Sequence, residues 1–456
     1  MSMSTKRLIR YWIRSAPLTF NDVVPIMSLQ HPLRMPCLVF ANDRGEIQDF
    51  PELEMAGRSG SWFLRPELTD LIPLPGGSEL FVLPQRNPIG IEKESGDPVL
   101  LDANPFDPRS GIQAVAAFMA PAHTAIFTSA FEKRSPDIDP LPLFAYTAVG
   151  WLDDRFWVCA FRSDPDIRQD SAGFDPGRIR TMTEKKLKAF PKNRLIQHLG
   201  KCCLTYSCPA AKNFFLGRYE APLPTSPGCN AQCVGCISLQ ASGCCPSTQD
   251  RIKFVPTPAE IAEIAVPHLS SAPRPVVSFG QGCEGEPLLQ ADTIDKAIRL
   301  IRRQTDKGTI NLNSNSSLPE AVARLADAGL DSIRVSMNSA RKGCHTLYYR
   351  PQGFDFKNVL ESILVMKKAG RFVSLNYFIL PGFTDDPDEF AALCDLIDLY
   401  RPDLIQLRNL NMDPDWYFEV VQHPAREKPL GMRNWLEQLR QRFPELRFGY
   451  FNPALR

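Results

Sequence analysis

The sequence predicts an α/β protein in which a β-rich N-terminal region precedes six repeated βα units. Beyond about residue 221, short β-type runs alternate with segments whose apolar residues recur at i, i+3, i+4 and i+7. Capping patterns mark the starts of two of these helical segments. Before that point the chain is rich in Pro and Gly. Strands that alternate with helices imply a parallel sheet with right-handed crossovers and a functional site at the C-terminal ends of its strands.

The N-terminal region, predicted as a mixed α+β domain over residues 1–190, is expected to consist mainly of short strands and loops. Apolar or aromatic runs such as 37–40, 79–83 and 155–161 are separated by turn residues. Pro makes up 41 of 456 residues, about 9% against a typical value of about 5%. No catalytic motif is visible in this region, so its role stays unassigned.

A basic, helix-compatible segment, 181–199, is expected to bridge the two halves of the chain. The predicted boundaries place a connecting segment with cysteines at 191–214 and the βα domain at 215–456.

Two capping boxes with Pro at the first helical position, Thr257 to Glu260 and Asp386 to Glu389, predict helix starts. Helical periodicity marks the segments 294–301 and 390–397. The predicted strands are 220–223, 276–279, 309–312, 333–336, 372–378 and 404–407.

Composition excludes several classes of function. The 52 basic residues balance 51 acidic ones, so a broad nucleic-acid or anionic-membrane surface is not expected. The most apolar stretch, 114–127, is interrupted and too short to span a bilayer. Residues 1–20 resemble a short amphipathic segment rather than an export signal. The 13 cysteines are therefore expected to be metal ligands or free thiols of a cytoplasmic protein.

Three cysteines in the run from Ser226 to Cys236 have the spacing C-x3-C-x2-C: Cys229, Cys233 and Cys236. Three thiolates would leave one iron of a 4Fe-4S cluster open to a ligand that is not protein. The triplet alone also fits a zinc site completed by Cys244 or Cys245, or part of an electron-carrier cluster.

This spacing resembles that of the radical S-adenosylmethionine (radical SAM) superfamily. The resemblance implies that the open iron binds the amino and carboxylate groups of SAM. It further implies reductive cleavage of SAM to a 5'-deoxyadenosyl radical, which takes a hydrogen atom from a substrate. The implied fold is a partial (β/α)6 TIM-like barrel, which periodicity alone does not distinguish from a doubly wound sheet.

A Gly-Glu-Pro turn, Gly285 to Pro287, follows the second predicted strand about 50 residues after Cys236. By resemblance, Gly285 lets the backbone approach the methionine part of SAM, and Glu286 accepts a charge-assisted hydrogen bond from its ammonium group. The first glycine of the family's motif is replaced here by Glu284. By itself, a Gly-Glu-Pro turn is most often a plain helix entry.

Small polar residues end the third and fourth predicted strands. The resemblance assigns Asn313, Ser336 and Asn338 to the ribose hydroxyls and carboxylate of SAM, whereas Asn and Ser also cap helices at such places. On the sixth strand, Gln406 and Arg408 alternate with apolar residues and are expected to point into the barrel. Arg408 is predicted to hold a carboxylate of SAM or of substrate, with a structural ion pair as the alternative.

Many family members carry an aromatic residue immediately before the third cysteine, but this sequence has Gly235. Adenine is then expected to depend on backbone or on residues such as Ile237. Tyr348, Tyr349 and Arg350 suit a substrate lid, although such an aromatic pair is usually buried.

Five further cysteines near the cluster loop raise the hypothesis of a second iron-sulfur cluster, with ordinary buried thiols as the favoured alternative. They are Cys202, Cys203, Cys208, Cys244 and Cys245. Cys283 and Cys344 are interpreted as packing residues, with a hydrogen-atom donor or a substrate anchor as the alternatives.

The predicted function is a radical SAM enzyme of unidentified substrate and reaction. An electron donor such as flavodoxin or ferredoxin is implied, and the N-terminal domain favours a peptide or protein substrate over a metabolite. Nucleic acid is disfavoured by the neutral net charge. A non-catalytic iron-sulfur electron carrier and a zinc-stabilised binding module stay open as alternatives.

Overall fold

The structure is a computed structural model and describes residues 31–240, 245–424 and 428–456. The predicted amphipathic segment at the N-terminus and Cys244 lie outside these ranges. Within them, no helix combines the length and apolar character that crossing a bilayer requires.

The N-terminal region is β-rich, as predicted. Among the described residues, an antiparallel sheet of 11 strands has the order β10-β14-β13-β1-β2-β7-β12, with β5, β6, β8 and β9 paired to it off this path. A second sheet has three strands in the order β11-β3-β4. The predicted runs 37–40, 79–83 and 155–161 correspond to β1, β6 and β14. The strands are β1 Cys37–Asn42, β2 Ile47–Met55, β3 Gly57–Ser59, β4 Trp62–Leu64, β5 Leu71–Pro73, β6 Glu79–Leu83, β7 Arg86–Glu92, β8 Pro98–Leu100, β9 Ile112–Phe118, β10 His123–Ala125, β11 Thr128–Ser129, β12 Phe131–Lys133, β13 Val149–Leu152 and β14 Arg155–Arg162.

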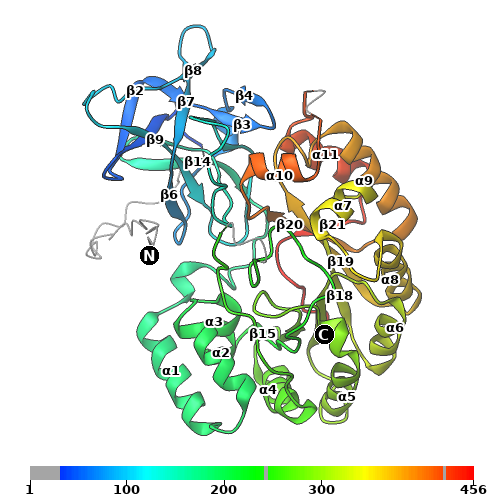
Figure 1. The fold of residues 1–456 in the computed structure, drawn as a ribbon. Coiled ribbons are helices and arrows are strands. Elements are labelled where there is room, and N and C mark those ends of the chain that lie inside the picture. The colour runs from blue at the N-terminus through cyan, green and yellow to red at the C-terminus, as the bar shows by residue number, and fades with distance from the viewer. Residues whose placement is uncertain (1–30, 241–244, 425–427) are drawn as a thin grey trace.

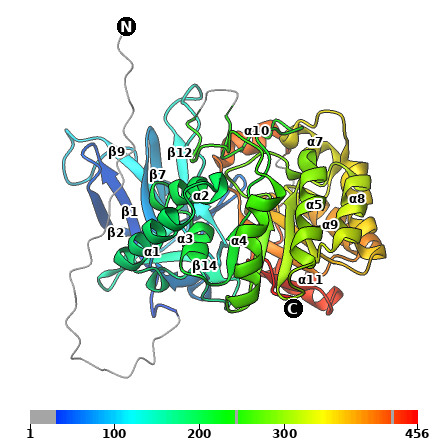
Figure 2. The ribbon, with the colours of Figure 1, turned by 90° about the horizontal axis from the view of Figure 1, so that it is seen from below.

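Three short helices connect this region to the rest of the chain: α1 (Pro176–Ala189), α2 (Arg194–Leu204) and α3 (Pro209–Phe215). The predicted helical segment is interrupted after Phe190 because Pro191 follows, and Asn193 caps the new helix by accepting from the Ile196 N–H. Figure 2 shows these helices between the N-terminal strands and α4 (Pro258–Ser271). The predicted boundary at 190/191 falls between α1 and α2, which pack together, and the domain boundaries stay predictions.

The C-terminal part is a curled parallel sheet covered on its outside by helices, which confirms the predicted α/β half-barrel. Strand order follows chain order from β15 to β21, so every connection is a βα unit between neighbours. Figure 1 shows α4, α5, α6, α8 and α9 in an arc around the sheet. The strands are β15 Glu220–Pro222, β16 Val276–Phe279, β17 Thr309–Ser314, β18 Ser332–Met337, β19 Phe372–Ile379, β20 Leu404–Asn409 and β21 Arg447–Gly449. The remaining helices are α5 Ala291–Arg302, α6 Pro319–Ala328, α7 Lys342–Tyr349, α8 Phe356–Lys368, α9 Pro387–Tyr400, α10 Pro414–Val420 and α11 Met432–Arg442.

All six predicted strands are present, together with a seventh, β21, that was not predicted. The capping box at Thr257 and Glu260 is confirmed. The second capping box is confirmed only in part. The Asp386 side chain caps α9, but the Glu389 side chain does not accept a hydrogen bond from the Asp386 N–H. Its buried carboxylate instead accepts hydrogen bonds from Ser339 Oγ, Arg341 Nε, the Ala340 N–H and Tyr377 Oη. Four donors in the interior outweigh one exposed capping contact.

A buried ion pair joins the N-terminal sheet to the half-barrel. Arg86 Nη2 at the start of β7 lies 2.8 Å from Asp413 Oδ2, and their side chains are 2% and 0% exposed. Asp413 Oδ2 also accepts from the Leu141 N–H at 2.9 Å, and Asp413 Oδ1 caps α10. Asp413 therefore holds together the sheet, a loop and a helix.

Replacing Arg86 by Leu is expected to lower the free energy of unfolding by about 3–5 kcal/mol, because Asp413 would keep a buried charge without its partner. Urea denaturation followed by tryptophan fluorescence measures this. The matched control is Arg34→Leu, which removes the exposed pair with Asp153 (side chains 72% and 67% exposed) and should cost less than about 1 kcal/mol. Equal losses in both variants would show that the buried pair has no special structural role.

Candidate active site

The inner face of the half-barrel is lined by polar side chains. In-register pairing places Ser278 beside Asn311 and Asn313 beside Arg334. The same register places Ser336 beside Asn376 and Asn376 beside Gln406. The alternate residues, such as Ile310, Ile333 and Leu375, belong to the apolar core under the outer helices. The predicted inward placement of Gln406 and Arg408 fits this register.

A hydrogen-bonded network fills one part of this inner face. Glu220 Oε1 accepts from Ser278 Oγ at 2.5 Å and from Asn452 Nδ2 at 2.8 Å. Asn452 comes from the C-terminal tail, and its Oδ1 accepts from Gln406 Nε2. Asn313 Oδ1 accepts from Asn311 Nδ2 and Asn452 Nδ2 at 2.8 and 3.2 Å. The SAM contact predicted for Asn313 stays a prediction.

Two guanidinium groups, Arg334 on β18 and Arg408 on β20, also lie on this face. In the part of the chain that the structure describes, neither has a hydrogen bond or an ion pair. Burial, followed by the charge of Arg408, lowers the pKa of Arg334 to about 9. Arg408 Cζ stacks 3.9 Å from the centre of the Tyr450 ring. The structural ion pair considered for Arg408 is therefore absent among the described residues, and this face offers two cations to an anionic ligand.

The loop after β15, which carries the three cysteines, is joined by backbone hydrogen bonds to the Gly-Glu-Pro turn after β16. Gly285 N–H donates to the Ser226 carbonyl at 2.7 Å, and Glu286 N–H donates to the Gly228 carbonyl at 2.8 Å. A Cβ on Gly285 would lie 1.9 Å from the Gly228 oxygen. Glycine is thus required at 285 by the cluster loop itself.

Glu284, which replaces a family glycine, fastens the same two loops. Its Oε2 accepts from the Thr225 and Ser226 N–H groups at 2.7 and 2.9 Å. Its Oε1 accepts from the Gly280 and Gln281 N–H groups at 2.6 and 2.8 Å. Burial raises the pKa of Glu284 to about 7, against the four backbone donors, which lower it. Glu284, which departs from the family motif, therefore links the two loops through its carboxylate; this link is called the Glu284 bracket below.

The three cysteine thiols lie close enough to influence one another electrostatically. Burial, and then the neighbouring thiols Cys236 and Cys229, raise the pKa of Cys233 well above its ordinary value. Burial and then Glu286 raise the pKa of Cys229 to about 11. The three sulfurs thus lie within electrostatic reach of one another, yet they do not form a group with all atoms within 4.8 Å. A polynuclear cluster, which spreads its ligands, fits this arrangement better than a single ion.

Glu286 lies beside this triplet with part of its hydrogen-bonding capacity already used. Its Oε1 accepts from Ser314 Oγ at 2.6 Å and from the Leu288 N–H at 3.0 Å, and its Oε2 accepts from the Asn315 N–H at 2.8 Å. Burial raises the pKa of Glu286 to about 7. An ionised carboxylate has about four acceptor positions, so three donors leave room for one more.

Tyr348 occupies the space that Gly235 leaves empty. A Cβ on Gly235 would lie 2.7 Å from the Tyr348 hydroxyl oxygen. The end of α7 also pairs with the cluster loop, because Val234 N–H donates to the Tyr348 carbonyl and Gln232 N–H to the Tyr349 carbonyl, each at 3.0 Å. Tyr348 and Tyr349 are buried, so the predicted alternative of a buried pair agrees with the structure.

Arg251 is a residue near the triplet that the sequence did not single out. Its Nη2 lies 3.5 Å from Cys236 Sγ, and its Nε lies 3.2 Å from Ser238 Oγ. Arg251 lies 15 residues after Cys236 and belongs to no recognisable motif, so the sequence gives no signal for it. A cation that donates to a ligand sulfur would stabilise added negative charge on a bound cluster.

The remaining predicted contacts have mixed surroundings. Asn338 Nδ2 donates to the Cys344 carbonyl and Tyr417 Oη, while Asn338 Oδ1 has no partner among described residues. Ser336 is half-buried on the inner face. Asn409 faces away and bonds the backbone of Ala125 and His123, which attaches β10 to β20.

Of the five cysteines of the second-cluster hypothesis, Cys244 lies outside the described residues, and the other four do not form one group. Cys202 and Cys203 lie in the core cluster that includes α2, whereas Cys245 lies in a different cluster with Cys344 and Tyr348. Cys203 Sγ lies 3.4 Å from Thr183 Oγ1.

Comparison with known proteins finds a family match in this part of the chain. Residues 223–394 match the model of the radical SAM superfamily. The chain is 25% identical over 177 residues to the FeMo cofactor biosynthesis protein NifB of Klebsiella pneumoniae (36% of this chain, 37% of that protein). It is 24% identical over 187 residues to the mitochondrial GTP 3',8-cyclase of Arabidopsis thaliana (41% and 44%). The chain thus spans less than half the length of these relatives.

Solved structures with a similar arrangement include methylornithine synthase (PylB), with a TM-score of 0.37 and 14% identity over 61% of this chain and 76% of that one. Another is the FeFe-hydrogenase maturase HydG from Carboxydothermus hydrogenoformans, with a TM-score of 0.36 and 14% identity over 59% and 68%.

Gly285→Ala is expected to abolish most bound cluster, because its methyl group would separate the two loops at Gly228. The visible absorbance of the anaerobically reconstituted protein, with iron and sulfide content, measures this. Gly343→Ala on α7 is the control, since a Cβ there meets nothing within 4 Å. Full cluster content in Gly285→Ala would contradict the close approach of the loops.

Proposed function

The chain belongs to the radical SAM superfamily through residues 223–394, and we propose that it is an enzyme whose cluster ligands are Cys229, Cys233 and Cys236. Its cofactors are a 4Fe-4S cluster and SAM. When bound, they supply the reductive cleavage of SAM to a 5'-deoxyadenosyl radical that abstracts a hydrogen atom from the substrate. The substrate and the final product are unidentified.

The observation that carries this proposal is the junction of the two loops at one edge of the sheet. The three thiols follow β15, the Gly-Glu-Pro turn follows β16, and two backbone hydrogen bonds with the Glu284 bracket hold them together. In a parallel half-barrel this is the edge where binding residues gather.

The roles of individual residues are proposed from the resemblance to the family and, for Glu286, Tyr348 and Arg251, from their contacts. Glu286, with one acceptor position left, is proposed to bind the ammonium group of SAM. Asn313, Ser336 and Asn338 are proposed to contact the ribose or carboxylate, and Arg408 the carboxylate. Tyr348 covers Gly235 from above the loop and would exclude water from the cysteine triplet. Arg251 would hold the Cys236 thiolate by an N–H donor.

Zinc at the triplet is the less supported alternative. A tetrahedral zinc ion brings its ligands to within about 4 Å of one another, given Zn–S of about 2.3 Å and Zn–N of about 2.0 Å. The three sulfurs are not gathered within 4.8 Å. The electron-carrier alternative shares the cluster and differs only in its response to SAM.

A peptide or protein substrate is proposed because the N-terminal region borders a cleft on the half-barrel. The cleft, of about 330 Å³, lies between the loop of Gly60 to Trp62 and the segment of α10, with Lys133 and His423 also in its lining. Trp62 is 44% exposed there. An exposed aromatic beside charged groups suits a polypeptide better than a small metabolite. Flavodoxin or ferredoxin is proposed as the reductant, and the cytoplasmic location stays a prediction.

The cluster assignment is tested by electron paramagnetic resonance of the reconstituted, reduced protein before and after SAM is added. A reduced 4Fe-4S signal that shifts with SAM, with release of 5'-deoxyadenosine, is the expected result. The triple variant Cys229→Ala, Cys233→Ala, Cys236→Ala should lose the signal, while Cys394→Ala, a buried cysteine on α9, should keep it. A signal indifferent to SAM would favour the electron carrier.

Arg408→Met is expected to weaken SAM binding by roughly 10-fold to 100-fold, because a hydrogen bond to a charged group contributes about 1.5–3 kcal/mol. Equilibrium dialysis with SAM and the reconstituted protein measures the Kd. Arg324→Met on the outer helix α6, where the Arg324 side chain is 55% exposed and pairs with Asp292, is the control and should leave the Kd unchanged. An unchanged Kd in Arg408→Met would contradict the proposed contact between Arg408 and the carboxylate of SAM.

A further inference from the structure

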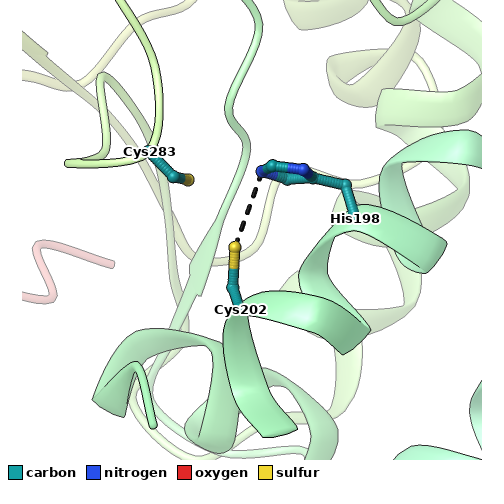
Figure 3. Close-up of side chains that lie close together, drawn as sticks. All are labelled: His198, Cys202 and Cys283. Atoms are coloured by element: carbon teal, nitrogen blue, oxygen red, sulfur yellow. Dashed lines mark hydrogen bonds between the residues drawn. The ribbon is translucent and has the colours of Figure 1, made fainter. Parts of the chain in front are cut away.

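Three metal-ligating side chains meet away from the cysteine triplet (Figure 3). His198 and Cys202 lie one turn apart on α2, and Cys283 lies in the loop between β16 and the Gly-Glu-Pro turn. His198 Nε2 is 3.5 Å from Cys202 Sγ. All three ligand atoms lie within 4.8 Å of one another, and no other such trio of His, Cys, Asp or Glu exists in the described ranges.

The spacing of this group matches a single small ion. A tetrahedral zinc site with Zn–S of about 2.3 Å and Zn–N of about 2.0 Å separates sulfur from nitrogen by about 3.5 Å. The observed distance of 3.5 Å between His198 Nε2 and Cys202 Sγ equals this value. This group is compact where the triplet of Cys229, Cys233 and Cys236 is spread.

We propose that His198, Cys202 and Cys283 bind one zinc ion. One imidazole and two thiolates form a donor set that zinc prefers, and the two sulfurs are nearly enclosed, with Cys202 1% and Cys283 4% exposed. His198 is half-buried and leaves a side open for entry. The fourth position falls to water or to Cys208, whose N–H donates to the Cys202 carbonyl at 3.0 Å.

A disulfide between Cys202 and Cys283 is the main competing arrangement. It would leave the His198 imidazole without a function in the group, although Nε2 points at Cys202 Sγ (Figure 3). An i, i+4 pair of His and Cys on one helix face supplies two ligands from a rigid element. The geometry therefore favours the ion over the disulfide.

The ion would clasp the connecting helices to the loop that carries the Gly-Glu-Pro turn. Cys283 directly precedes Glu284, whose carboxylate holds the Thr225 and Ser226 N–H groups. Cys283 also accepts from the Ile252 N–H through its carbonyl at 2.7 Å. The inference does not depend on the proposed radical chemistry, because the clasp is built from residues outside the triplet.

The test uses the triple variant Cys229→Ala, Cys233→Ala, Cys236→Ala, so that cluster iron cannot confuse the metal count. Mass spectrometry of the purified protein should find about one zinc per chain, as a single site requires. Adding Cys202→Ser, Cys283→Ser or His198→Asn should remove most of it. Adding Cys159→Ser or Cys394→Ser, which alter buried cysteines elsewhere, should leave it.

Cobalt gives a second readout that needs no variant in this group. Added to the zinc-depleted triple variant Cys229→Ala, Cys233→Ala, Cys236→Ala, Co²⁺ should produce thiolate charge-transfer and tetrahedral d–d absorption bands. The stoichiometry should be about one Co²⁺ per chain. Cys208→Ser shifts these bands if Cys208 is the fourth ligand and leaves them if water is.

Three results would overturn the proposal. One is zinc-free protein with free thiols at Cys202 and Cys283 and no cobalt bands. Another is a disulfide, seen as two thiols that react only after reduction. The third is iron with sulfide in the triple variant that disappears with Cys202→Ser, which would make the site a second cluster.

Discussion

The contact between the cysteine loop and the Gly-Glu-Pro turn is the constraint on which the site depends. The Gly285 and Glu286 N–H groups donate to the Ser226 and Gly228 carbonyls at 2.7 and 2.8 Å, so the backbones of the two loops are in direct contact. Only glycine permits this approach at 285. Because the loops start from adjacent strands, β15 and β16, the parallel sheet fixes their spacing before any ligand arrives.

Glu284 shows how a departure from a motif can be absorbed by the same contact. A buried carboxylate is costly unless donors surround it, and burial indeed raises the pKa of Glu284 to about 7. Four backbone N–H groups from both loops offset that cost. Where the family has a flexible glycine, Glu284 links the two loops through its carboxylate. This link stiffens the loops that carry Cys229 and Glu286. Pre-organised loops bind a cofactor without a further loss of conformational entropy.

The sequence predicted what depends on local pattern and missed what depends on tertiary contact. Strands β15 to β20 were readable because β-type runs alternate with helical periodicity, and the Thr257 cap because its partner is three residues away. Glu389 shares the capping pattern, but donors from β19 and the loop after β18 take its carboxylate. Asn452 and Arg251 reach the site from other segments of the chain, so no spacing marks them. His198 and Cys283, 85 positions apart in the sequence (283 − 198), meet only because α2 packs beside the β16 loop.

The inner face of the sheet separates two electrostatic tasks. Near Glu220, polar groups satisfy one another through Asn452 and Ser278, so that part is a closed structural network. Around Arg334 and Arg408, buried Nε donors lack hydrogen-bond partners among the described residues, and the charge of Arg408, after burial, lowers the pKa of Arg334. Such an arrangement raises the free energy of the ligand-free protein, and an anion that enters between the cations lowers it. The inner face thus has one part in which polar side chains satisfy one another and another part in which two guanidinium groups have no hydrogen-bond acceptor among the described residues.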